Sequence, residues 1–223
     1  YVILLDYFDD DNIDIELGPR IRISSRSRQR PTAETAAAKY VWGGIDNSSV
    51  CIHLSAMKDI LEHAVSFKDR EVGGVLLGYE CCNQPVGSID LRQAIKASHT
   101  IENRASLTFT HQTWLDLDRV IKQNKMNCEI LGWYHSHPSF GIFLSEYDQF
   151  IHRHFFSGAS QVAMVVDPVE KTVGLFTWDN GILRPVKGIT IYASTKDSCS
   201  QIRSVIADWF WVGSGKLTTR EEG

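Results

Sequence analysis

The chain has 223 residues and a mass of 25.2 kDa, enough for one well-filled domain with appended structure. With 43% apolar and 22% charged residues, its composition excludes collagenous, low-complexity and disordered chains. A net charge of −4 argues against binding to nucleic acid or to anionic membranes through bulk electrostatics, and no apolar run approaches the roughly 20 residues that cross a bilayer. Five cysteines without a regular spacing predict reduced thiols and a cytoplasmic protein.

The first 44 residues form a predicted N-terminal extension with an uneven charge. Residues 1–16 carry six acidic side chains and no basic one, whereas residues 17–30 carry five arginines and no acidic one. Alternating apolar residues predict strands at Val2–Leu5 and Ile13–Ile23, and the alanine-rich stretch Thr32–Lys39 predicts a short helix. The opposed charges fit either a hairpin whose strands face each other or an arm that docks onto a partner protein.

The central segment, residues 45–193, combines strands and helices without the strict alternation of a doubly wound sheet. This pattern predicts an α/β fold in which helices flank a mixed β-sheet. We expect strands at Val50–Leu54, Val72–Tyr79, Ile89–Ala97, Leu107–Thr110, Cys128–His135, Gln161–Asp167, Thr172–Trp178 and Ile189–Tyr192. Amphipathic spacing predicts helices at Ser55–Phe67, Gln112–Lys125 and Ser145–Phe156, and Ser55 is the expected cap of the first.

The last segment, residues 194–223, is predicted to hold a closing helix at Gln201–Val212 and a tail. The aromatic side chains of this helix either pack on the core or offer a docking surface for another protein, because tryptophan and phenylalanine are enriched at interfaces.

The stretch from Gly132 to Asp148 concentrates the residues that can do chemistry. His135 and His137 lie two apart in an extended segment, so both side chains point to the same side. Ser145 and Asp148 lie three apart at the start of a predicted helix and therefore share one face of its first turn. Two imidazoles and one carboxylate are the three-ligand set of a catalytic zinc, which keeps its fourth position for water.

Each part of this pattern also has a purely structural interpretation. Ser145 followed by Asp148 is the pattern of a helix cap with an acidic third position, and a capping serine can serve a site at the same time. A second histidine pair, His152 and His154, lies within a predicted helix, where positions two apart diverge, so we interpret it as surface or core filling.

The joint pattern H-x-H-x7-S-x-x-D resembles the signature of the JAMM metalloproteases, also called the MPN+ or JAB1/MPN/Mov34 family. The segment Glu71-Val-Gly-Gly-Val-Leu-Leu-Gly78 is similar to the upstream element of that family, in which a glutamate precedes glycines and aliphatic residues. The resemblance covers about residues 49–192 and implies an MPN domain with a cytidine-deaminase-like architecture.

The resemblance also implies a role for each site residue. His135, His137 and Asp148 would hold one catalytic zinc ion, and Glu71 would act as general base toward its water. Ser145 would donate a hydrogen bond to the oxyanion of the tetrahedral intermediate. Downstream of His154 the chain has no histidine and only Cys199, so a second, structural zinc of the kind that some members carry is not expected.

The family's activity implies a protein substrate. A groove at Gly73 and Gly74 would accept the C-terminal tail of ubiquitin or a ubiquitin-like protein by strand addition, and the enzyme would hydrolyse the isopeptide bond after its last glycine. The compact chain is similar to members from bacterial ubiquitin-like conjugation systems. Two alternatives stay open: a non-catalytic MPN scaffold that binds partner proteins, and a JAMM hydrolase acting on a non-ubiquitin peptide or a sulfur-carrier conjugate. A partner could also dock on the N-terminal extension or on the C-terminal aromatic helix.

Overall fold

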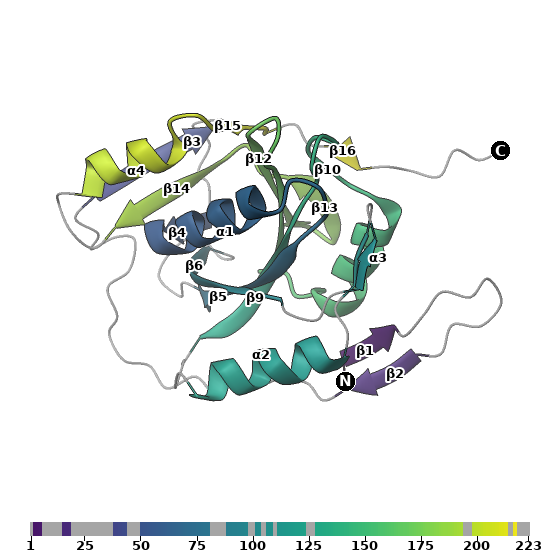
Figure 1. Cartoon of the computed structure of the whole chain (residues 1–223). Helices are drawn as coiled ribbons and strands as arrows, with labels where there is room; N and C mark the ends of the chain where they lie inside the picture. The colour runs from purple at the N-terminus through teal and green to yellow at the C-terminus, as the bar shows by residue number, and fades with distance from the viewer. Residues whose placement is uncertain are drawn as a thin grey trace.

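One mixed sheet of ten strands runs through the protein (Figure 1). The computed structural model describes residues 2–5, 15–18, 38–43, 50–80, 88–97, 101–103, 106–108, 111–123, 128–193, 198–213 and 216–217. Strand β9 (Glu129–Ser136) lies in the middle of the sheet, parallel to β11 (Val162–Asp167) and antiparallel to β5 (Gly73–Glu80). Along the sheet the order is β13 (Ile182–Pro185), β12 (Thr172–Asp179), β11 (Val162–Asp167), β9 (Glu129–Ser136), β5 (Gly73–Glu80), β6 (Ile89–Lys96), β4 (Val50–His53), β14 (Gly188–Ala193) and β3 (Ala38–Gly43), with β15 (Phe210–Trp211) beside β12.

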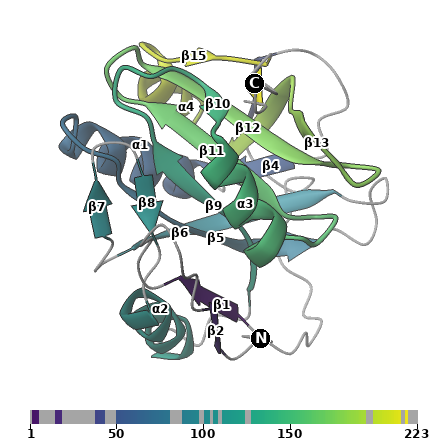
Figure 2. The ribbon, with the colours of Figure 1, turned by 90° about the vertical axis from the view of Figure 1, so that its right-hand side faces the viewer.

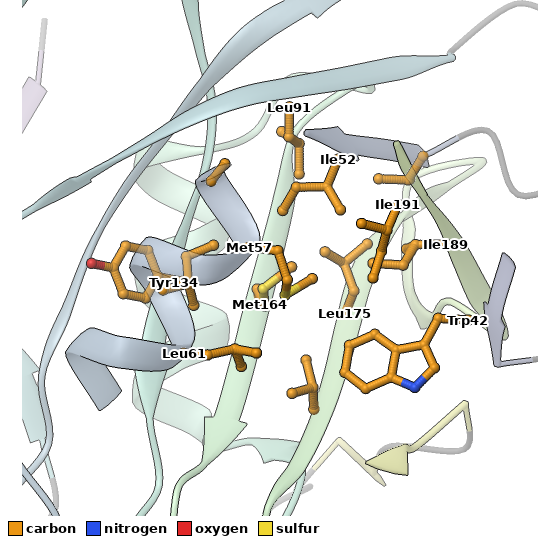
Figure 3. Packing of buried hydrophobic residues seen from close by; sticks show 14 of the residues in the cluster. Trp42, Ile52, Met57, Leu61, Leu91, Tyr134, Met164, Leu175, Ile189 and Ile191 are labelled. Carbon is orange, nitrogen blue, oxygen red and sulfur yellow. The ribbon is translucent and has the colours of Figure 1, made fainter. Parts of the chain in front are cut away.

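In the described part of the chain, four helices accompany the sheet: α1 (Leu54–Ser66), α2 (His111–Gln123), α3 (Glu146–Phe155) and α4 (Ser198–Ile206). Helices α1 and α4 pack into one apolar cluster, which Figure 3 shows around Met57 and Met164, and α2 and α3 pack into another. Figure 2 shows α3 in front of β9 and β11, with α1 behind them. The mixed α/β fold expected from the sequence is therefore confirmed.

The central strands are buried on both faces. Along β5, Leu76 belongs to the cluster under α1, whereas its neighbours Val75 and Leu77 belong to the cluster under α2 and α3. Successive side chains of a strand point to opposite faces, so a strand covered on both sides needs apolar residues at every position. This explains the continuous apolar run in β11, Val162–Val166.

Within the ranges that the structure describes, three small strand pairs lie outside the main sheet. Strands β1 (Val2–Leu5) and β2 (Ile15–Gly18) form an antiparallel pair, as do β7 (Ile101–Asn103) and β8 (Ser106–Thr108). Strand β10 (Phe143–Leu144), directly before α3, pairs in parallel with β16 (Lys216–Leu217). Among the described residues, no helix is both long and apolar enough to span a membrane.

The N-terminal prediction is confirmed only in part. The two strands pair as Val2–Leu5 with Ile15–Gly18, within or next to the acidic stretch, while residues 13–14 and 19–23 of the predicted second strand lie outside the described residues. The arginines of residues 20–30 lie outside the described residues, so charge pairing across the hairpin stays a prediction. The division at residue 44 also stays a prediction, although β3, which precedes it, pairs with β14 as an edge strand of the main sheet.

Two helix predictions were wrong near their ends. Ala38 and Lys39 begin strand β3 rather than ending a helix, because Trp42 is buried against Trp211 when this segment pairs with β14; residues 32–37 lie outside the described part. The closing helix ends at Ile206, not Val212, and Phe210–Trp211 extend along β12. There the Trp211 indole N–H donates to the carbonyl of Val186 at 3.1 Å, a bond that requires the chain to leave the helix.

Helix α1 begins one residue earlier than the sequence predicted, and its cap is His53 rather than Ser55. The Nδ1 atom of His53 accepts the backbone N–H of Ser55 at 3.3 Å. Histidine is an unusual capping residue, so the pattern of preferred caps pointed to the serine two positions later.

Helix α1 also carries a buried histidine that makes stability depend on pH. The Nδ1 atom of His63 lies 2.8 Å from the Tyr134 hydroxyl, and burial, with a contribution from Lys96, lowers its pKa to about 4. In the unfolded chain His63 binds a proton near pH 6.5, whereas in the folded chain it binds one only near pH 4. The free energy of unfolding therefore has its full value above pH 6.5 and falls as the pH is lowered toward 4.

We therefore expect the free energy of unfolding to fall by on the order of 1–2 kcal/mol from this group between about pH 7 and pH 5. The variant His63→Gln is neutral and keeps an acceptor for Tyr134, so urea titrations at the two pH values should show a smaller loss. His154→Gln, which changes an exposed histidine, should behave like the parent protein. An equal acid loss in His63→Gln and the parent would contradict this assignment.

Candidate metal centre

Three side chains converge at one end of β9 and the start of α3. The ligand atoms of His135, His137 and Asp148 all lie within 4.8 Å of one another, and all three residues are buried. The two Nε2 atoms are 2.9 Å apart. The carboxylate oxygens of Asp148 lie 3.4 Å from Nε2 of His135 and 3.6 Å from Nε2 of His137. The structure thus brings together the three side chains that the sequence predicted as metal ligands.

Strand geometry explains why the two histidines meet. Between them, Ser136 points the other way: its N–H donates to the carbonyl of Val72, and its hydroxyl accepts the N–H of Val72 at 2.9 Å. The backbone N–H of His137 donates to Val166 on β11 at 2.8 Å, so the strand stays paired up to the second ligand. The alternation of an extended chain therefore delivers both imidazoles to one side.

The first turn of α3 supplies the carboxylate through a capping box. The Ser145 hydroxyl accepts the N–H of Asp148 at 3.1 Å, and Oδ2 of Asp148 accepts the N–H of Ser145 at 2.8 Å and its hydroxyl at 2.6 Å. The structural and the functional interpretation of this motif therefore hold together, because the hydrogen bonds that start the helix also fix the carboxylate beside the imidazoles.

Glu71 lies beside the three ligands without belonging to them. It is buried just before β5, and its Oε1 atom is 3.8 Å from Nε2 of His137. Burial raises the pKa of Glu71 to about 7; Asp148 adds to the rise and His137 opposes it. A carboxylate with such a pKa can take up and release a proton near neutral pH.

Burial and the neighbouring charges shift the pKa of each candidate ligand. Burial lowers the pKa of His135, while Asp148 and Glu71 overcome the effect of burial on His137 and raise its pKa. Burial alone would raise the pKa of Asp148, but the two imidazoles and the Ser145 hydroxyl hold it below its usual range. Asp148 is therefore the charged member of the set, as expected where a divalent cation binds.

The surroundings of the two Nδ1 atoms also fit a zinc ion bound through Nε2. Nδ1 of His137 lies 3.3 Å from the carbonyl oxygen of Gly141 and donates its proton there, which leaves Nε2 free to bind a metal. Nδ1 of His135 is buried without a hydrogen-bond partner in the described part of the chain, and its ring stacks on Trp133 with centroids 4.5 Å apart. One ligand is thus oriented by a hydrogen bond and the other by packing.

The two glycines of the predicted tail groove lie inside the sheet. The backbone of Gly73 and Gly74 pairs with β9 on one side and with β6 or Ala97 on the other. A strand cannot add where both edges are occupied, so the predicted mode of tail binding at these residues does not agree with the pairing. A β-carbon at Gly74 would lie 2.1 Å from the carbonyl oxygen of Ile95, and this close approach explains the glycine.

The second histidine pair behaves as expected. His152 is buried and its Nδ1 atom accepts the indole N–H of Trp133 at 3.2 Å, while His154 is exposed on α3. The sequence reasoning missed Asp167, a buried carboxylate at the end of β11 that binds the loop after His137. An acidic residue that ends a fully apolar strand, followed by proline, was the available signal.

Comparison with known proteins identifies the family. The sequence model described as JAB1/Mov34/MPN/PAD-1 ubiquitin protease matches residues 46–158. The chain is 28% identical over 158 residues to the 26S proteasome regulatory subunit RPN11 of Eremothecium gossypii, covering 70% of this chain and 48% of that protein. It is also 28% identical to the ubiquitin carboxyl-terminal hydrolase RPN11 of Saccharomyces cerevisiae, covering 59% of this chain and 43% of that one.

A third relative, COP9 signalosome complex subunit 5 of Neurospora crassa, is 28% identical over 161 residues, 70% of this chain and 46% of that one. The chain spans about half the length of these curated relatives. Among solved structures, protein DSY2949 of Desulfitobacterium hafniense matches with a TM-score of 0.50 and 17% identity, over 66% of this chain and 96% of that one, which supports the fold. With the family model matching half of its length, the chain belongs to the JAB1/Mov34/MPN/PAD-1 family, the family of the JAMM or MPN+ proteins.

Proposed function

We propose that the protein is a zinc-dependent isopeptidase that hydrolyses the bond after the C-terminal glycine of ubiquitin or a ubiquitin-like modifier. The observation that carries this proposal is the convergence of His135, His137 and Asp148, with the buried carboxylate of Glu71 3.8 Å from His137. The relative from Saccharomyces cerevisiae, whose name describes a ubiquitin hydrolase, supports the substrate class.

His135, His137 and Asp148 would hold the zinc ion, which when bound lowers the pKa of a coordinated water toward ~7 and polarises the substrate carbonyl. Glu71 accepts the proton of the attacking water on its carboxylate and delivers it to the departing amine. With a pKa of about 7, the carboxyl group is able to serve in both directions near neutral pH.

Ser145 stabilises the negative charge that develops on the carbonyl oxygen. Its hydroxyl proton, which now points to Oδ2 of Asp148 at 2.6 Å, turns toward the substrate. The capping box survives this turn, because the N–H of Ser145 keeps its own bond to Oδ2 and the hydroxyl oxygen still accepts the N–H of Asp148.

The proposal also covers the partners of the protein and the compartment in which it acts. Partners are the modifier and its conjugates, with no nucleic acid and no membrane, and the compartment is the cytoplasm.

Metal content and substrate choice test this function together. Elemental analysis of the purified protein should find one zinc per chain. A ubiquitin-like protein joined to lysine should be cleaved, with activity lost in EDTA and restored by added zinc. Absence of zinc together with binding of partner proteins would favour a non-catalytic scaffold, and cleavage of short peptides in preference to the conjugate would favour a different substrate class.

A further inference from the structure

The loop that follows the second histidine has an unusual backbone. Between His137 and β10 the chain turns through Ser139 at φ 67° and Gly141 at φ 80°, both in the left-handed region. For a serine this conformation is unfavourable, so other interactions must hold the loop in place.

Asp167 provides those interactions. It is fully buried at the end of β11, and its two carboxylate oxygens accept four backbone N–H groups. Two belong to the loop, from Ser139 at 3.1 Å and Gly141 at 2.9 Å, and two to the turn after β11, from Val169 at 2.9 Å and Glu170 at 3.1 Å. One carboxylate therefore fastens the loop to the neighbouring strand.

Gly141 connects this carboxylate to the metal ligand. Its N–H donates to Asp167, and its carbonyl oxygen, on the other side of the same residue, accepts the Nδ1 proton of His137. We propose that Asp167 is a positioning residue for the zinc site: by holding Gly141, it keeps the proton of His137 on Nδ1 and the lone pair of Nε2 directed at the metal. This inference rests on the proposed zinc function.

The contrast between the two histidines makes the proposal specific. His137 depends on the loop for its orientation, whereas the ring of His135 stacks on Trp133 and makes no hydrogen bond through Nδ1 in the described residues. Removing the carboxylate of Asp167 should therefore change the tautomer and orientation of His137 and leave the ring of His135 as it was.

The variant Asp167→Asn tests this. The asparagine side chain has the size of aspartate, but its NH₂ group replaces one of the two acceptor oxygens. Backbone N–H groups that donated to that oxygen lose their acceptor. We expect zinc affinity, measured by competition with a chelator, to fall about 10–100-fold. In the metal-free variant, nitrogen-15 NMR of the imidazole rings should show His137 losing the Nδ1-protonated tautomer that the parent protein shows.

Asp90→Asn is the matched control. Asp90 is also a buried carboxylate, but it lies on β6 and accepts hydrogen bonds from the Tyr192 hydroxyl and the Arg92 guanidinium. Its loss should lower thermal stability and leave zinc affinity and the His137 spectrum unchanged. A folded Asp167→Asn variant with the parent's zinc affinity and the parent's tautomer would overturn the proposal.

A second pair of variants decides the question if Asp167→Asn does not fold. Gly141 and Gly181 have nearly the same φ, 80° and 78°, and at both an added β-carbon would meet nothing within 4 Å. Gly141→Ala should weaken zinc binding and shift the His137 signals, whereas Gly181→Ala, in the turn between β12 and β13, should not. Equal zinc affinities in this pair would contradict the role of the loop. Failure of the parent protein to bind zinc would instead contradict the proposed function itself.

Discussion

The variant Glu71→Gln is expected to lower kcat for isopeptide hydrolysis by about 10²–10⁴-fold. Glutamine has nearly the same shape as glutamate but cannot take a proton from water. Glu71 is not one of the three proposed ligands, so the variant should still bind one zinc per chain and should still bind the modifier. Single-turnover cleavage of a ubiquitin-like conjugate, with elemental analysis of the same sample, measures both quantities.

Glu62→Gln is a suitable control for this variant. Glu62 lies exposed on α1, where it pairs with Lys58 at 3.6 Å, and the same change of charge there should leave cleavage unaltered. Full activity of Glu71→Gln would remove the general base from the mechanism, and loss of zinc in that variant would show that the carboxylate supports the metal instead.

The variant Asp148→Ala should abolish both zinc binding and hydrolysis. Asp148 is the only carboxylate of the three-ligand set, and two neutral imidazoles alone hold zinc weakly. The same change also removes the acceptor of the Ser145 N–H at the start of α3, so the metal-free protein should lose stability as well. Zinc titration and thermal unfolding in EDTA distinguish the two effects.

The variant Ser145→Ala distinguishes the loss of the helix cap from the loss of the Asp148 carboxylate. It removes the bond to the N–H of Asp148, at a cost of about 1 kcal/mol, but keeps all three ligand side chains. This variant should therefore bind zinc and lose about 10²–10³-fold in kcat, as expected for the loss of one oxyanion donor. If Asp148→Ala bound zinc as well as Ser145→Ala does, the assignment of the third ligand would be wrong.

The candidate ligands could be chosen from the sequence because their placement depends on local geometry. His135 and His137 needed only the two-residue period of a strand, and Ser145 with Asp148 needed only the first turn of a helix. Only the family resemblance indicated that the end of β9 and the start of α3 would face each other. Glu71 likewise depended on it, because no local pattern says that a residue before β5 will reach the end of β9.

The rest depended on tertiary contacts that one sequence does not display. Asp167 acts on a loop about 26 positions earlier, through hydrogen bonds to backbone groups that carry no residue signature. Trp211 leaves the predicted helix because Trp42 and the carbonyl of Val186 offer it a better environment, which overrides local helix propensity. The tail groove at Gly73 was predicted without knowing that both edges of β5 are paired.

The parts of the candidate site come from segments at different distances along the chain. The three ligands come from one short stretch, His135 to Asp148, whereas Glu71 reaches them only when β5 pairs with β9, as in the pairing of Gly73 with His135. Closing that long loop costs chain entropy, which the finished sheet repays. In the proposed function the two parts of the site therefore make different demands on the fold: the three candidate ligands lie close together in the sequence, whereas the general base reaches them only through long-range strand pairing.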